Sequence, residues 1–492
     1  MAQREQWGTR IGFILAAVGS AIGLGNIWRF PYMVYDNGGG AFLIPYFFAL
    51  FTAGIPIIIL EFGMGSIFKG SAPKTLAKAK AGWEWLGWWQ VLIGFTLSIY
   101  YVVIIAWALI YTLLAVNQGW GQDTKAFFYE EFLQLSSSPM SWEGIVWPIF
   151  IAAAVIWVIN WGVMFCGVKS GVEKANKVFM PILFVLILTM LARTVTLNGV
   201  ADGLQWLFQP DFSAILDYKV WAAAYGQIFF SLSICFGVMI TFSSYLPEGS
   251  DIVNNGVMIA LINCGFNMLA GIMIFGVLGF MAQAEGVPIE EVAGSGVGLA
   301  FVTIPKAIGL LPGSGFFGIL MFLALVFAGL SSMISLIEST CAALMDRLGW
   351  SRGLATTLCC SAGFVFSLIF MTRGGLLVLD IVDHFLNNFG MVLAGLVEII
   401  LLSWFFRLGS LRRQINAVSD FAVGPWWNFC LKIITPLVLG YMALGNLIGD
   451  IRSAYGGYPG SALFIFGWAM VIGLVLLSLV IHRLGEVTDR WL

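Results

Sequence analysis

The sequence predicts an all-α integral membrane protein with twelve transmembrane helices. Of its 492 residues, 60% are hydrophobic and only 10% are charged, whereas a soluble domain carries about 25% charged residues. The mean hydropathy is +0.93. The apolar residues form long continuous runs of about 20 residues, as spanning helices require, and not the alternating segments of roughly ten residues that are typical of membrane barrels.

No gap between the apolar runs is long enough for a separate soluble domain, so residues 1–492 are predicted to form one transmembrane domain. The ends of each run are uncertain by about 2–4 residues. The twelve runs are Ile11–Tyr35, Ala41–Phe68, Leu86–Val116, Ile145–Phe165, Val178–Leu197, Val220–Tyr245, Ile252–Met281, Phe316–Leu344, Leu354–Met371, Leu376–Phe406, Trp427–Ile448 and Ala462–Ile481.

The distribution of positive charge predicts that both termini are cytoplasmic. With the N-terminus inside, the inner segments hold 16 Lys and Arg residues and the outer segments hold 7, and positive residues are retained on the cytoplasmic side. All seven cysteines lie in or next to apolar runs, and there is no Asn-x-Ser/Thr glycosylation sequon. These features suit a multi-pass protein of a plasma membrane, such as the bacterial inner membrane.

Two apolar runs contain helix-breaking segments at corresponding positions. Residues 19–26 of the first run include three glycines, and residues 230–237 of the sixth run include two serines and a glycine. Close helix packing through Gly19 and Gly23 is the simpler interpretation of the glycines alone. However, broken helices in membranes line cavities, and paired breaks in two halves of a chain indicate a transporter binding site.

The polar side chains near these breaks favour a cation site. Hydroxyl and amide oxygens are hard ligands that suit an alkali cation. A further pair of adjacent hydroxyls, Ser331 and Ser332, lies in the eighth run, although serines in membrane helices commonly bond back to a carbonyl one turn earlier. The polar side chains meant here, from the first, sixth and seventh runs, are Ser20, Asn26, Ser231, Ser233, Asn263 and Asn267.

Several motifs resemble the neurotransmitter:sodium symporter family. They are Trp7 and residues 23–31, 37–42, 226–233 and 327–332. The resemblance covers essentially the whole chain and is greatest to bacterial amino-acid transporters with a leucine-transporter-like fold. It implies two inverted five-helix repeats, about 10–197 and about 220–406, followed by two helices at about 427–482. In that fold the first and sixth helices are unwound at mid-membrane.

The resemblance implies two sodium sites. The first would use the Ala21 carbonyl with the side chains of Asn26, Ser231 and Asn263, completed by a carboxylate of the substrate. The second would use the carbonyls of Gly19, Ile22 and Ala328 and the hydroxyls of Ser331 and Ser332.

The resemblance also implies an amino-acid site between the two breaks. Ser20 stands where monoamine transporters carry Asp, so the substrate is expected to bring its own carboxylate. The apolar pocket then favours a neutral, mostly apolar amino acid, and a non-alpha amino acid such as GABA or taurine is the alternative. The predicted substrate-binding residues are Ser20, Ala21, Ile22, Gly23, Leu24, Gly25, Leu97, Tyr101, Phe230, Ser231, Ser233, Ile234, Phe236, Ser332 and Leu336.

Ionisable residues in the apolar runs match the two gates of the family. Arg29 and Asp383 would form the outer gate, with Tyr101 and Phe236 as the lid over the substrate. Arg4 and Asp346 would form the inner gate, assisted by Trp7 and Tyr245. Glu61 and Glu398 are interpreted as anchors of the unwound backbone, since buried acids in membranes need specific partners.

One position departs from the pattern of sodium-only bacterial members, which carry an acidic residue where this sequence has Asn267. Chloride-dependent relatives have a neutral residue there, and the anion replaces the missing negative charge. We therefore predict that chloride is a further coupled ion. Its site would be formed by Tyr46, Gln227, Ser231, Asn263 and Asn267.

The predicted function is sodium-coupled import of an amino acid by alternating access, which is symport and not enzyme catalysis. An ion channel is the main alternative, but channels usually form their pore from rings of several subunits. No P-loop, metal-ligand spacing or basic stretch for nucleic acid is present. The expected partners are the substrate and the lipid bilayer, with a functional monomer and a dimer as the alternative.

Overall fold

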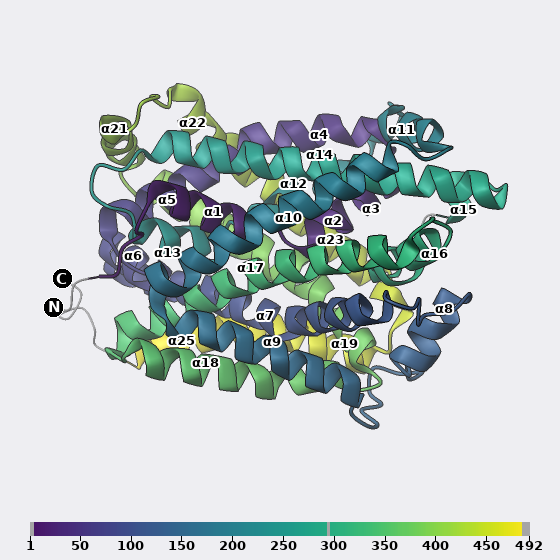
Figure 1. The fold of residues 1–492 in the computed structure, drawn as a ribbon. Coiled ribbons are helices and arrows are strands. Elements are labelled where there is room, and N and C mark those ends of the chain that lie inside the picture. Colours follow the sequence, from purple (N-terminus) through teal and green to yellow (C-terminus); the bar gives the residue numbers. More distant parts are fainter. Residues whose placement is uncertain (1–3, 293–295, 485–492) are drawn as a thin grey trace.

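The computed structural model describes residues 4–292 and 296–484. These residues form a helical bundle without any β-strand; two isolated bridges join Gly39 to Pro210 and Ile145 to Thr372. Most helices run roughly parallel or antiparallel to one another (Figure 1). The predicted all-α class is therefore confirmed for the part of the chain that is described.

Ten of the twelve predicted apolar runs correspond to helices long and apolar enough to cross a membrane. The other two, the first and the sixth, are divided into shorter helices. Short 3₁₀ or π segments join several of the helices below into longer spans. In chain order the helices are α1 (Arg10–Ala21), α2 (Leu24–Ile27), α3 (Arg29–Asp36), α4 (Leu43–Ala49), α5 (Ile55–Phe68), α6 (Ala72–Ala79), α7 (Glu84–Leu114), α8 (Thr124–Ala126), α9 (Trp147–Phe165), α10 (Glu173–Thr194), α11 (Val200–Phe208), α12 (Tyr218–Ser231), α13 (Val238–Ser244), α14 (Ile252–Glu285), α15 (Ile289–Val292), α16 (Ile304–Gly309), α17 (Ser314–Leu348), α18 (Arg352–Ser367), α19 (Gly375–Phe385), α20 (Val392–Ile400), α21 (Leu408–Val418), α22 (Pro425–Phe429), α23 (Thr435–Arg452), α24 (Gly460–Ala462) and α25 (Ala469–Arg483).

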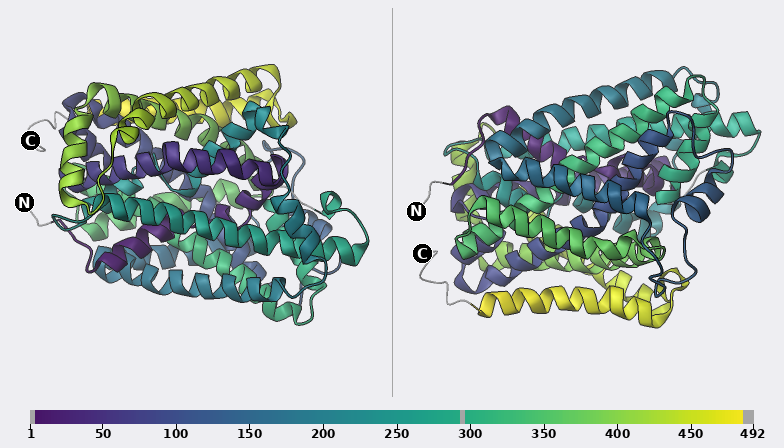
Figure 2. Two further views of the ribbon diagram at one scale, coloured as in Figure 1. Left: turned by 90° about the horizontal axis from the view of Figure 1, so that it is seen from above. Right: turned by 60° about the horizontal axis from the view of Figure 1, so that its bottom comes forward.

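The helices differ in how much of their surface the protein itself covers. The helices α7 and α17 pack against each other in the middle of the bundle and are mostly buried. The last two spans, which contain α23 and α25, bury only 22% and 17% of their most apolar windows inside the protein. Figure 2 shows the yellow C-terminal helix at the edge of the bundle. Helix α1 begins and α25 ends on the same side of the bundle. Apolar side chains on the outer surface are what a bilayer would solvate.

The first break separates α1 from α2. Thr9 caps the start of α1 by accepting a hydrogen bond from the Gly12 amide. The helix stops at Ala21 because Ile22 and Gly23 have extended backbone conformations. The amide of Gly23 then donates to the Asn26 side-chain oxygen at 3.0 Å. The polar side chain thus satisfies a backbone group that helix breakage exposes.

The second break separates α12 from α13. Within it Ser233 and Cys235 have positive φ values of 51° and 67°, and Gly237 has a φ of 70°. Positive φ is costly for residues with a side chain. The Cys235 amide donates to the Glu61 carboxylate of α5 at 2.6 Å, which holds the segment in this conformation. Glu61 therefore contacts the non-helical backbone as the sequence analysis predicted.

Candidate substrate and ion site

The two breaks enclose a small inner cavity of about 20 Å³. None of the eleven residues that line this cavity is charged, and all eleven were predicted to belong to the substrate or sodium sites. Of the predicted substrate residues, Ile22, Leu24, Ser231 and Ile234 lie outside this lining, and Gly25 borders a second cavity. The lining consists of Ser20, Ala21, Gly23, Asn26, Leu97, Tyr101, Phe230, Ser233, Phe236, Ser332 and Leu336.

Hydroxyl groups join the two breaks to the neighbouring helix α17. The Ser233 hydroxyl donates to the Ser20 carbonyl at 2.8 Å, and the Ser20 and Ser335 hydroxyls are 2.7 Å apart. The Tyr101 hydroxyl accepts a hydrogen bond from the Leu24 amide at 2.8 Å. Because all of these groups are buried, they form a preorganised polar surface beneath an otherwise apolar pocket.

Two aromatic residues lie at the boundary between the inner cavity and the outer one. Phe230 and Tyr101 line both cavities, whereas Phe236 lines only the inner one. The Phe230 ring lies so close to Gly25 that a Cβ there would be 2.6 Å from it, and the Arg29 guanidinium lies 4.7 Å from the ring centroid. The lid of Tyr101 and Phe236 stays a prediction, and Phe230, which lines both cavities beside Tyr101, is the second candidate for it.

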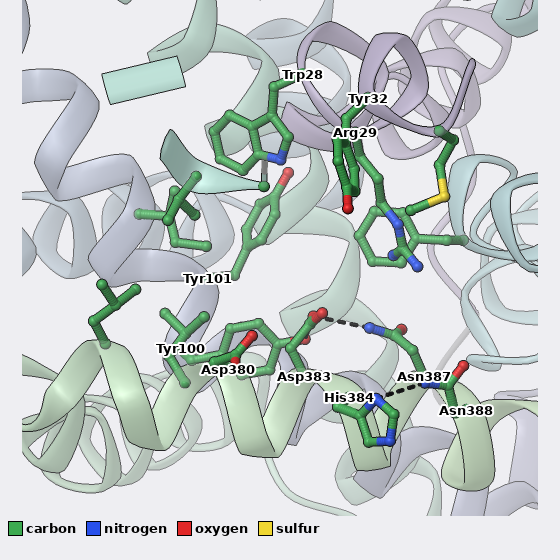
Figure 3. Close-up of a pocket in the computed structure, with 18 of the residues that line it drawn as sticks. Trp28, Arg29, Tyr32, Tyr100, Tyr101, Asp380, Asp383, His384, Asn387 and Asn388 are labelled. Atoms are coloured by element: carbon green, nitrogen blue, oxygen red, sulfur yellow. Dashed lines mark hydrogen bonds between the residues drawn. The ribbon is translucent and has the colours of Figure 1, made fainter. Parts of the chain in front are cut away.

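The outer cavity has a volume of about 280 Å³ and lies between α3 and the region of α19. Figure 3 shows Arg29 and Tyr32 on one side and Asp383 and His384 on the other. Arg29 and Asp383 do not form an ion pair here. Asp383 instead accepts hydrogen bonds from the Tyr100 hydroxyl at 2.7 Å and the Asn387 amide at 2.8 Å. The two predicted outer-gate residues thus face one cavity, and their pairing stays a prediction.

The predicted inner-gate residues are joined by an ion pair. The Arg4 guanidinium donates to both Asp346 oxygens at 2.9 and 3.0 Å. Lys74 and the Ser71 amide also donate to Asp346, at 3.1 and 2.8 Å. Burial alone would lower the pKa of Arg4, but the charge of Asp346 outweighs this effect and raises the pKa above its usual value. Arg4 therefore remains a cation in this network.

Two aromatic residues complete the inner network. The Trp7 indole donates to the Phe242 carbonyl at 2.8 Å, and the Trp7 amide donates to the Tyr245 carbonyl at 3.1 Å. The Tyr245 ring lies 4.9 Å from the Arg4 guanidinium, and its hydroxyl donates to Glu338 at 2.6 Å. The segment before α1 is thereby held against α13 and α17 on the side opposite the outer cavity.

The side chains predicted for the first sodium site form one hydrogen-bonded cluster. The Asn26 amide donates to the Asn263 oxygen at 2.7 Å and to the Ser231 hydroxyl at 3.1 Å, and the Asn263 amide donates to the same hydroxyl at 2.6 Å. All three side chains are buried. Their oxygens are of the hard type that binds sodium.

The groups predicted for the second sodium site are also close together. The Ser332 hydroxyl lies 3.2 Å from the Gly19 carbonyl, and the Ser331 hydroxyl lies 2.9 Å from the Ala328 carbonyl. Ile22, whose carbonyl would be a further ligand, follows α1 in an extended conformation. A cation could replace the hydrogen bonds between these hydroxyl and carbonyl oxygens, so the donor set fits sodium.

The residues predicted to bind chloride lie beside the first sodium site. The Asn267 amide donates to the Tyr46 hydroxyl at 2.7 Å and to the Ser231 hydroxyl at 3.3 Å. Gln227 is fully buried, and neither its amide nitrogen nor its oxygen has a partner among the described residues. An unsatisfied buried amide donor one helical turn before Ser231 fits an anion, since burial without a partner is costly.

Several contacting residues were absent from the predicted site, and three of them illustrate why. Ser335 contacts Ser20 from α17, and Lys74 and Ser71 contact the inner-gate aspartate. Ser335 belongs to the run of small polar residues at 328–335, which was a usable signal. Lys74 and Ser71 lie in and next to the short α6 after the second span, and nothing in the local sequence indicates that this helix reaches α17.

The two broken helices of this apolar bundle enclose a polar cavity, which lies between an outer cavity and a closed inner network. This arrangement defines a membrane transporter. The chain belongs to the sodium:neurotransmitter symporter family, whose model matches residues 4–123 and 120–486. This is a family of secondary transporters and not of enzymes.

The relatives extend over nearly the whole chain. An uncharacterised sodium-dependent transporter of Methanocaldococcus jannaschii is 44% identical over 490 residues, 99% of each protein. A sodium- and chloride-dependent taurine transporter of Bos taurus is 30% identical over 536 residues, 100% of this chain and 86% of the relative. A sodium- and chloride-dependent GABA transporter of Bos taurus is 31% identical over 514 residues, 96% of this chain and 85% of the relative.

Proposed function

We propose that this sodium-dependent transporter imports a neutral, mostly apolar amino acid together with sodium by alternating access. The protein would have twelve transmembrane helices, arranged as two inverted repeats and two further helices, with the first and sixth helices unwound at mid-membrane. It would lie in a plasma membrane with both termini cytoplasmic. The observation that carries the choice of substrate is the inner cavity, whose lining contains hydroxyls, carbonyls and apolar groups but no charged side chain.

An uncharged lining selects for a substrate that balances its own charges. Burying a lone ammonium or carboxylate without a partner is strongly unfavourable, whereas an amino acid carries both. Its carboxylate would complete the first sodium site beside Asn26, and its ammonium would meet the Ser20 carbonyl and the Ser233 hydroxyl. Leu97, Phe236 and Leu336 would contact the side chain, and their apolar surfaces favour an apolar group.

The two closures of the site support alternating access. On the outer side, Phe230 and Tyr101 line both the outer and the inner cavity. On the other side, the Arg4–Asp346 pair and the Trp7 contacts join the N-terminal segment to α13 and α17. Movement of Phe230 away from Gly25 would admit substrate from outside, and dissociation of the inner network would release it inside.

Chloride is proposed as a coupled ion because the site has no acid at position 267. The buried cluster of Tyr46, Ser231 and Asn267, with the unpartnered amide of Gln227, supplies donors for an anion. Near a sodium ion, an anion would also offset positive charge in a low-dielectric interior. Replacing chloride by gluconate is expected to lower uptake strongly, and unchanged uptake would contradict the proposal.

A second candidate substrate class is a non-alpha amino acid. The named relatives at 30% and 31% identity are taurine and GABA transporters. Such molecules also carry one positive and one negative group, so the uncharged lining accepts them equally. The distance between those groups is what distinguishes the two classes.

The experiment is a radiolabelled uptake panel with purified protein in liposomes and an inward sodium gradient. It contains small, branched and aromatic neutral amino acids, GABA, taurine and one monoamine. We expect saturable uptake of a neutral amino acid that disappears when choline replaces sodium. Preference for GABA or taurine would select the second class, preference for the monoamine would refute the substrate argument, and non-saturating flux would indicate a channel.

A further inference from the structure

A buried asparagine faces the first helix break from the fifth span. Asn176 lies in the first turn of α10 and is 1% exposed. Its side-chain nitrogen donates to the Val172 carbonyl at 2.9 Å. Its side-chain oxygen is fully buried and has no hydrogen-bond partner among the described residues. An unsatisfied buried acceptor costs about 1–3 kcal/mol, so this oxygen requires an explanation.

The oxygen points at the backbone of Gly19. A Cβ on Gly19 would lie 2.3 Å from the Asn176 oxygen and 3.2 Å from the Cβ of Ser331. Only glycine therefore lets the asparagine approach so closely. Met180, one turn further along α10, contacts the same place with its sulfur, at 3.1 Å from the same Cβ position. The Asn176 oxygen thus lies where α1 and α17 bring together two proposed ligands of the second sodium site.

The polar neighbourhood of Asn176 leads towards the inner side of the bundle. Glu173, three residues earlier, accepts hydrogen bonds from the Gly8 amide at 2.6 Å and from the Thr9 hydroxyl at 2.8 Å. Gly8 and Thr9 belong to the segment that precedes α1 and contains the inner-gate residues Arg4 and Trp7. Asn176 therefore lies between the second sodium site and the inner face along α10.

We propose that the side-chain oxygen of Asn176 is an additional ligand for the sodium ion of the second site. This inference rests on the proposed sodium-coupled function. An amide oxygen is a hard, neutral ligand that suits sodium. All five groups proposed for that site are themselves neutral carbonyls and hydroxyls, so a sixth oxygen strengthens binding without adding charge. Bonding of the amide nitrogen to Val172 fixes the orientation of the oxygen.

The test measures the sodium concentration that gives half-maximal uptake in liposomes. Asn176→Leu removes the oxygen at similar size, and Asn176→Asp keeps an oxygen at the same place. Asn160→Leu in α9 is the matched control, because Asn160 is equally buried and its oxygen also lacks a partner, yet it contacts Cys360 and not the break. Uptake at saturating sodium reports whether each variant is folded.

We expect Asn176→Leu to raise the half-maximal sodium concentration about tenfold, which corresponds to about 1.4 kcal/mol. Asn176→Asp is expected to keep or lower it, and Asn160→Leu to leave it within twofold. A wild-type value for Asn176→Leu would overturn the inference, as would equal changes in Asn176→Leu and Asn160→Leu. If Asn176→Leu does not fold, a raised half-maximal sodium concentration in Asn176→Asp overturns it. Uptake by the wild type that does not depend on sodium would instead refute the proposed function itself.

Discussion

Closure of the outer side depends on the absence of a side chain at Gly25. In a Gly25→Ala variant the new Cβ would lie 2.6 Å from one carbon of the Phe230 ring and 3.2 Å from the next. Ordinary contact begins near 3.4 Å, so the ring has to retreat by about 0.8 Å. Overpacking of this kind costs about 1–3 kcal/mol, which corresponds to about a 5- to 150-fold smaller closed population.

The assay is sodium-dependent binding and uptake of the best substrate from the panel. We expect the apparent affinity to fall by a factor in that range. Gly265→Ala is the control, because Gly265 lies in α14 with nothing within 4 Å of its Cβ position, so it gains helix propensity without a clash. The double variant Gly25→Ala, Phe230→Leu removes the end of the ring and should recover part of the affinity. Unchanged affinity in Gly25→Ala alone would refute the lid assignment.

Three further substitutions follow from the contacts of the site. Asp346→Asn removes the charge that holds Arg4 and should destabilise inner closure by about 3 kcal/mol. Labelling of a reporter cysteine on the inner path should then rise while coupled uptake falls. Unchanged labelling would argue against an inner gate. Asn267→Asp should make uptake independent of chloride, whereas retained chloride dependence would place the anion elsewhere. Ser20→Asp puts an unpaired carboxylate beside Ser335 in the otherwise uncharged lining, so uptake of amino acids should fall at least about tenfold, and wild-type uptake would contradict the argument from an uncharged lining.

The spanning helices could be predicted because long apolar runs determine them almost independently of tertiary context. The two runs that contain Gly19–Asn26 and Phe230–Gly237 were expected to break, and the structure divides both. Composition did not give the residues at which the helices end. Those depend on partners from distant helices, such as the Glu61 carboxylate on the Cys235 amide.

The lid was placed at Phe236 by the resemblance to the family, and the local sequence offers no way to choose between Phe236 and Phe230. Phe230 and Phe236 are six residues apart, but the backbone between them contains positive φ values at Ser233 and Cys235. Helical spacing therefore says nothing about which ring faces outward. Residues that reach the site from other helices, such as Lys74 and Asn176, were missed for a related reason: their own local sequence carries no signal of what they contact.

The two closures of the site rest on different forces, and this has a consequence for the conditions in which the protein works. The outer side is held by ring contact between Phe230 and Gly25, whereas the inner side is held by mostly buried charges around Asp346. Mobile ions mainly screen solvent-exposed charges that lie more than about 8 Å apart at physiological ionic strength, whereas Arg4 and Asp346 are only 2.9 Å apart and mostly buried. Neither closure therefore depends strongly on ionic strength, so the direction in which the resting protein faces should change little when the salt concentration of the cytoplasm changes.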